Sequence, residues 1–460
     1  MRRLQPLVAF LVLALAIGGA VYADREVGAR SFEPGADGAA SSGVWFCPHG
    51  GGPEGWEVDL QVANPGDEAA TIRVRTLGEE RPAAPETLRV EPGSFLQVPV
   101  QARGRARGSV VEWFGSWVAV GWVAHAGGGE GGVAAEPCAP QAGERWLLPD
   151  GTTESDTSSD LVVVMNPFAR EAVFSVTLLS ERQEPVRQGE LTDVALRPFR
   201  AVAFPLNDVV LGERTVAARV DVSVGRVAAA TLGVVKPTGG IRSAIGYLGA
   251  PPETLAFPGG GDSGRTDLVV MNGAEDVAGR AALDGLLEGT QGGQPFPGLA
   301  DASLPPGSGR TFPATTDGPT TVVLTVTGRD VATVRRTFGV TSDQAAVTGG
   351  EPAAAWIVLP AVAGFPSNPG LVLSNPGTEP AVVTLRYLLP GPPEEVEVTV
   401  PPGGTAQAPE EFALLAPEVG VVASATTGTF VPAAASYSLG REGMATYAVA
   451  LGIPMPEGSA

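Results

Sequence analysis

Two cysteines and two histidines are the residues of this sequence best suited to chemistry, and all four lie between positions 47 and 138. Cys47, Cys138, His49 and His125 offer the ligand set of a tetrahedral metal site. Their spacing matches no common zinc-finger pattern, and two cysteines in an exported chain form a disulfide more often than a metal site. We therefore expect a Cys47–Cys138 disulfide and no metal.

Motifs for catalysis and for cofactors are weak. No Gly-x-Ser-x-Gly sequence is present, so a Ser or Cys triad would have to use one of the two histidines. The loop from Asp150 to Asp160 gathers four carboxylates that suit calcium, but it lacks the EF-hand spacing, and we expect it to be solvated. We expect no catalytic residues and no cofactor; a hydrolase that uses paired carboxylates is the least favoured hypothesis.

Tryptophans are the best candidates for a binding role. Five of the seven lie between positions 45 and 122, and Trp113, Trp117 and Trp122 fall on one predicted hairpin. Exposed aromatic rings can stack on sugars or anchor a protein partner. A hairpin tryptophan more commonly fills a sandwich core, so both interpretations stay open.

A recurring asparagine organises the chain. Four of the six asparagines end an apolar run at a regular interval of roughly 100 residues, at Asn64, Asn166, Asn272 and Asn375. Asparagine before Pro-Gly suits a tight turn, because Pro presets φ, Gly accepts positive φ and the Asn side chain bonds the backbone ahead of it. We interpret these four residues as structural turn residues rather than as a row of ligands.

Each interval repeats one succession of predicted strands. An opening strand ends in Pro, the Asn strand and a hairpin partner follow, and a Pro turn then leads to a Gly-centred hairpin. About seven strands in each repeat predict an all-β chain of four immunoglobulin-like β-sandwiches. The predicted repeats are residues 44–140, 144–250, 253–350 and 354–455.

The length of the repeat and its short linkers predict how the sandwiches are arranged. Propeller blades usually run about 40 to 50 residues, half of this interval, so a closed propeller of four blades is disfavoured. Short linkers favour domains in a row that form a stiff rod.

The N-terminus predicts export. Residues 1–23 join two arginines to an apolar run and small residues, which is typical of a signal peptide or a membrane anchor. Residues 24–43 are expected to be a flexible spacer, and the rest of the chain to lie outside the cytoplasm, secreted or anchored to the membrane by the first segment. The net charge of −20 makes nucleic acid an unfavourable partner.

Several motifs together resemble a known family. The Trp45-x-Cys47-Pro opening, the Leu-x-Val-x-Asn-Pro-Gly turns and the Val-x-Pro-Pro-Gly turns, after a signal-anchor, are similar to uncharacterised envelope proteins of actinobacteria that form a domain of unknown function. The likeness covers most of residues 44–453 and implies no known activity.

Our first hypothesis is therefore a non-catalytic extracytoplasmic protein of the cell envelope that acts as a structural spacer or a protein-interaction scaffold, with an envelope protein as its partner. The alternative is binding of cell-wall polysaccharide through Trp113, Trp117 and Trp122.

Overall fold

The structure is a computed structural model that describes most of residues 42–456. The segments within this range that it does not describe are 128–129, 156–157, 236–239, 260–263, 277–280, 290–291, 301, 317, 340–342, 362–366, 390–393, 410–418 and 440–444. The predicted leader and most of the predicted spacer lie outside the described residues. Within the described part of the chain, no helix combines the length and the apolar composition needed to cross a bilayer.

Most of the described residues form strands, and no α-helix occurs among them, which confirms the predicted all-β class. We divide the strands into four groups. Group 1 holds β1 (Ser42–Cys47), β2 (Glu57–Asn64), β3 (Ala70–Leu77), β4 (Glu86–Val90), β5 (Ser94–Val100), β6 (Gly108–Gly115), β7 (Ala119–His125) and β8 (Val133–Pro137). Group 2 holds β9 (Arg145–Leu148), β10 (Ser158–Asn166), β11 (Ala172–Ser180), the 3-10 turn η1 (Gly189–Leu191), β12 (Val194–Leu196), β13 (Arg200–Pro205), η2 (Leu206–Asp208), β14 (Val216–Val224), β15 (Ala228–Val235), β16 (Gly240–Ile245) and β17 (Tyr247–Leu248).

The second half of the chain repeats this succession. Group 3 holds β18 (Thr254–Gly259), β19 (Arg265–Asn272), β20 (Ala281–Gly289), β21 (Gly292–Pro295), β22 (Ser303–Leu304), β23 (Ser308–Thr315), β24 (Thr320–Thr327), β25 (Val331–Phe338) and β26 (Gln344–Thr348). Group 4 holds β27 (Ala355–Val358), β28 (Ser367–Asn375), β29 (Ala381–Tyr387), β30 (Glu394–Val400), β31 (Gly404–Gln407), β32 (Val421–Thr427), β33 (Val431–Leu439), β34 (Ala445–Leu451) and β35 (Ile453–Pro454).

Every group forms two antiparallel sheets with the same strand order. In group 1 the orders are β1-β6-β3-β4 and β5-β2-β7-β8. The other groups repeat both orders, and groups 2 and 4 add β17 and β35 beside their first strands. This order differs from the immunoglobulin arrangement, in which the first, second, fifth and fourth strands share one sheet.

The turns after the second and the sixth strand cross from one sheet to the other, whereas β3–β4 and β7–β8 each pair within one sheet. The second strand β2 pairs with β5 and β7, whereas the third strand β3 pairs with β4 and β6. The two predicted hairpins of each repeat are therefore wrong in group 1, including the one that carries Trp113, Trp117 and Trp122. Local alternation identifies a strand but does not choose its partner.

The position of the Asn strand was predicted correctly. This strand ends at Asn64, Asn166, Asn272 and Asn375 in the four groups. Its middle residues are buried on both faces, as in β10, where Val162 and Val164 belong to the core of group 2. Val163 points the other way and lies near Gly50 of group 1. A strand that is apolar on both faces needs a cover on both faces, and the neighbouring group supplies the second one.

The four groups form a closed ring, so the predicted row of domains is wrong. Each group contacts the next, and group 4 also contacts group 1. Contacts at the four successive junctions include Gly78 with Arg200, Asp150 with Arg336, Thr321 with Thr405, and Arg386 with Pro65. Short linkers permit either arrangement, and the two-sided burial of the Asn strands favours closure.

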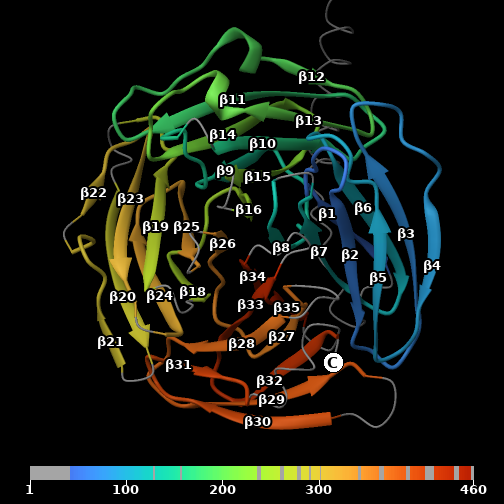
Figure 1. Ribbon diagram of the computed structural model, residues 1–460, viewed down its shortest axis with the longest axis vertical. Coiled ribbons are helices and arrows are strands. Elements are labelled where there is room, and N and C mark those ends of the chain that lie inside the picture. The colour runs from blue at the N-terminus through green and yellow to red at the C-terminus, as the bar shows by residue number, and fades with distance from the viewer. Residues whose placement is uncertain are drawn as a thin grey trace, which may run out of the picture. The chain divides into compact units, whose positions relative to one another are not determined.

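In each group, the last strand of the sheet that contains the Asn strand lies at the centre of this ring. Figure 1 shows β8, β16, β26 and β34 at the middle, with the remaining strands around them. Each of these inner strands contacts its two neighbours in turn. Small side chains such as Ala134, Ala345 and Ala448 meet there and leave no space for a water molecule. Alanine at these positions therefore allows four strands to approach one axis.

Candidate functional site

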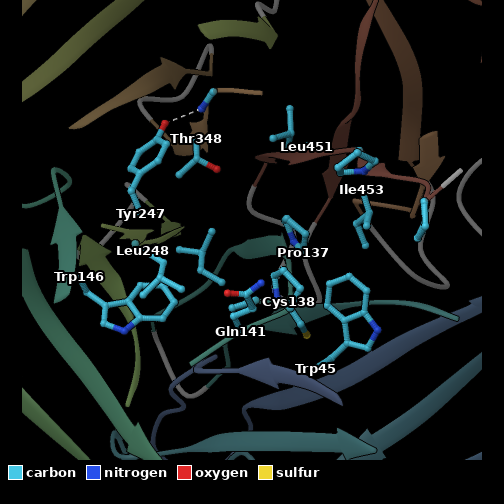
Figure 2. Close-up of a pocket in the computed structure, with 18 of the residues that line it drawn as sticks. Trp45, Pro137, Cys138, Gln141, Trp146, Tyr247, Leu248, Thr348, Leu451 and Ile453 are labelled. Carbon is cyan, nitrogen blue, oxygen red and sulfur yellow. Dashed lines mark hydrogen bonds between the residues drawn. The ribbon is translucent and has the colours of Figure 1, made fainter. Parts of the chain in front are cut away.

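A cavity of about 450 Å³ opens where the four inner strands end, and we call it the axial cavity. All four groups contribute to its wall. Its lining residues lie within 137–141, 245–248, 348–349 and 451–456, together with Trp45, Trp117 and Trp146. Figure 2 shows Trp45 and Trp146 on opposite sides, with Cys138 and Gln141 between them.

The wall forms because the chain turns back after each inner strand and packs against the first strand of its group. In group 2 this return is β17, which pairs with β9, and in group 4 it is β35, which pairs with β27. A Cβ atom at Gly246 would lie 2.4 Å from the side chain of Leu148, and one at Gly452 would lie 2.8 Å from Pro432. A side chain at either position would have to displace these neighbours, so glycine suits the close turn in groups 2 and 4.

In group 1 a cysteine takes the place of that glycine. The amide of Cys138 donates to the Val120 carbonyl at 2.9 Å, as the amide of Gly246 donates to Ala229 at 3.1 Å. Cys138 is bonded to Cys47, which confirms the predicted disulfide. The disulfide therefore ties the return segment of group 1 to its first strand.

Three of the four aromatic wall residues already use their polar atoms within the protein. The indole nitrogens of Trp45 and Trp146 donate to the carbonyls of Val118 and Val227 at 2.9 and 2.7 Å. The Tyr247 hydroxyl donates to the Thr333 carbonyl at 2.8 Å. Among the described lining residues none is charged. The cavity therefore presents carbon surface and suits an apolar ligand.

The three tryptophans predicted as binding residues separate in the structure. Trp117 is 9% exposed and lines the axial cavity, where it meets Trp45 edge to face with ring centroids 6.3 Å apart. Trp113 and Trp122 are buried elsewhere, against Gly43 and His49 respectively. They form no exposed aromatic face for stacking on a sugar.

Sequence reasoning missed most of the cavity wall. Neither Trp45 nor Trp146 has a predicted binding role, and Tyr247 belongs to no predicted site. One sequence signal for the wall is present: Gly246 follows β16, and Gly452 follows β34. A glycine directly after an apolar strand indicates a close turn of the chain.

The residues weighed as metal ligands do not assemble. The cysteines are bonded to each other, and the ring nitrogens of His49 lie 2.6 Å from the Gly50 carbonyl and 3.0 Å from the Ser109 hydroxyl. Burial lowers the pKa of His49 to about 4, so this ring is neutral at pH 7.

The predicted solvation of the acidic loop is wrong for Asp150 and Asp160, which form a buried ionic cluster, whereas Glu154 is exposed. Asp150 and Asp160 both bind Arg242, at 3.0 and 2.8 Å, and Asp150 also binds Arg336 of group 3. Burial opposes ionisation, but the charges of Arg242 and Arg336 outweigh it and lower the pKa of Asp150. Of the other predicted loop carboxylates, Asp156 lies outside the described residues. The cluster joins groups 2 and 3.

The four turn asparagines are buried and bonded to backbone. The Asn64 amide donates to the carbonyls of Glu68 at 2.8 Å and Glu91 at 3.1 Å, and its side-chain oxygen accepts from the Gly66 amide at 3.1 Å. Asn166 and Asn375 make corresponding bonds. These side chains join the turn after the second strand to the turn before the fifth, and they do not reach the axial cavity.

Comparisons with known proteins identify a family but no activity. A family model described as a family of unknown function (DUF5719) matches residues 103–355. No curated protein matches this chain. A solved structure described as a tetra-tandem repeat in the extending region of a large adhesion protein is 12% identical and covers 85% of this chain and 92% of its own. Its TM-score is 0.12, so this likeness carries no argument.

Proposed function

The chain belongs to the DUF5719 family, whose function is unknown, and we propose that it is a non-catalytic, extracytoplasmic interaction protein of the cell envelope that binds an apolar ligand in the axial cavity. The ring of four strand groups acts as a rigid scaffold for this site. The observation that carries the proposal is the composition of the cavity wall, which is apolar and contributed by all four groups.

The chemistry of the wall favours binding over catalysis. Proton transfer and charge stabilisation require ionisable groups or free hydrogen-bond donors directed at the substrate. The wall tryptophans Trp45 and Trp146 instead direct their donors into the protein. A ligand therefore gains from contact with carbon surface and from leaving water.

The proposed location rests on two features. The apolar leader in residues 1–23 is typical of export, and the Cys47–Cys138 disulfide is typical of an oxidising compartment. Of the two proposed roles, the closed ring favours an interaction scaffold over a spacer. Closure brings group 4 back to group 1, so the four groups do not extend in a row.

The test is binding of an uncharged fluorescent probe, N-phenyl-1-naphthylamine, to the purified protein with its disulfide intact. We expect saturable binding of one probe, with a rise in probe fluorescence. Leu248 is 38% exposed in the cavity wall, so Leu248→Arg places a charge at the site and is expected to weaken binding by at least about tenfold.

The matched control is Leu211→Arg. Leu211 is 71% exposed and is not part of the cavity wall, so this variant has the same change of charge and is expected to bind like the original protein. Absence of saturable binding, or equal loss in both variants, would rule out the axial cavity as the site.

A further inference from the structure

We infer that the ligand of the axial cavity is the hydrocarbon chain of a single-chain acyl lipid, held with its head group outside the wall. This inference rests on the proposed function and specifies the ligand class. It follows from the size of the cavity, from the hydrogen bonds that Trp45, Trp146 and Tyr247 already make within the protein and from the small number of polar side chains in the lining.

The size of the cavity favours a chain over a single side chain of a protein partner. A closed apolar cavity of about 150 Å³ accommodates benzene, which has six carbon atoms. The axial cavity measures about 450 Å³. By proportion it holds roughly 15 to 20 carbon atoms, which is the size of one long acyl chain and exceeds any protein side chain.

The chemistry of the wall disfavours sugars and ionised groups in the interior, because Thr348 and Gln141 are the only polar non-aromatic side chains among the described lining residues apart from the disulfide-bonded Cys138. A buried hydroxyl or carboxylate needs a hydrogen-bond partner. The Tyr247 hydroxyl is occupied by the Gly349 amide and the Thr333 carbonyl, and the Trp45 and Trp146 donors are directed to backbone carbonyls. Methylene groups make no such demand.

We expect the head group of the lipid to contact polar side chains where the lining is exposed to solvent. Gln141 is an exposed polar side chain of the lining, and the exposed Pro140 stands beside it. Because the described lining has no charged side chain, the wall does not distinguish an ionised head group from a neutral one. Recognition therefore depends on chain length.

The experiment measures displacement of N-phenyl-1-naphthylamine from the full-length protein by monoacylglycerols with chains of about 8 to about 18 carbons. We expect affinity to rise roughly fourfold with each added methylene, since each methylene leaves water, and to level off near about 16 carbons when the cavity is full. Fatty acids of equal length are expected to bind within about threefold of the monoacylglycerols, because the head group stays outside.

Each result separates this inference from the proposed function. If the probe binds but the lipids displace it without dependence on chain length, the acyl-chain inference is overturned and the apolar site stands. A fatty acid that binds more than about tenfold more weakly than its monoacylglycerol would place the head group inside, against the inference. Loss of the lipid response in Leu248→Arg, with retention in Leu211→Arg, assigns it to the axial cavity.

Discussion

The hydroxyl of Tyr247 in group 2 accepts a hydrogen bond of 2.8 Å from the amide of Gly349 in group 3. The same hydroxyl donates to the Thr333 carbonyl on β25, also at 2.8 Å. In groups 1, 2 and 4 the corresponding amide bonds directly to a carbonyl of the seventh strand, as Gly452 does to Pro432 at 2.9 Å. The Tyr247 hydroxyl thus lies between the Gly349 amide and the β25 backbone of group 3. It joins groups 2 and 3 at the wall of the cavity.

Tyr247→Phe is expected to destabilise the ring. The change leaves the Gly349 amide and the Thr333 carbonyl without this partner, at a cost of about 1–3 kcal/mol in the free energy of unfolding. Urea denaturation with Leu211→Ala as an exposed control, expected to change stability by less than about 0.5 kcal/mol, measures the effect. Equal stability of the two variants would show that the bridge does not hold the groups together.

Glu136 predicts a dependence of stability on pH. This β8 residue is 2% exposed, and burial raises its pKa well above the usual 4.5; the Ile245 backbone opposes the shift, and the charge of Asp150 adds to it. Tyr247 also lies within its electrostatic reach. A raised pKa in the folded state means that the folded protein binds more protons, so stability is full below pH 4.5 and falls as pH rises toward the folded pKa.

Glu136→Gln is expected to reduce this slope, to which Glu288 with its pKa raised by burial to about 7 also contributes, and to raise stability at pH 8 relative to the original protein. Denaturant unfolding at several pH values from about 4 to about 8 measures it. The exposed Glu394 provides the matched control, since Glu394→Gln should leave the slope intact. A parallel slope in the Glu136 variant would mean that this carboxyl does not cause the pH dependence.

Reduction of the disulfide is expected to destabilise group 1. Cys47 and Cys138 are separated by 91 positions, so the bond closes a long loop whose loss costs about 4–5 kcal/mol on the chain-entropy model. Urea unfolding of Cys47→Ala/Cys138→Ala beside the oxidised protein tests this. Probe binding by the variant provides a second measurement, and we expect it to weaken because Cys138 lines the cavity. Unchanged unfolding would contradict the prediction.

Asn166→Ala is expected to cost about 3 kcal/mol. Its side chain donates to the Arg170 and Leu196 carbonyls at 2.8 and 2.9 Å and accepts from the Phe168 amide at 3.1 Å, and all three partners lose a bond. Asn207 accepts one bond, of 3.2 Å, from the Asp160 amide, so Asn207→Ala is a matched control with an expected cost of about 1 kcal/mol. Similar losses in both variants would argue against a special role for the repeated asparagine.

Much of the local structure was predictable from the sequence. The all-β class, the disulfide and the end of the second strand at Asn64 and its three counterparts all follow from alternation, turn chemistry and cysteine number. These features depend on residues near one another in the chain or on chemistry with few alternatives. The run Leu161–Met165 is apolar at every position, and such a run predicts a strand that is buried on both faces. The structure buries it on both faces, and the residues that cover the second face belong to another group.

By itself, then, the sequence determined where the strands and turns lie and which cysteines bond. Only the tertiary structure decided which strands pair, that the four groups close into a ring, and that Trp45, Trp117 and Trp146 share a cavity with Tyr247. The physical reason is that strand formation is set by local backbone preferences and alternating side chains. Pairing and closure are set by burial of apolar faces against partners that are distant in the chain.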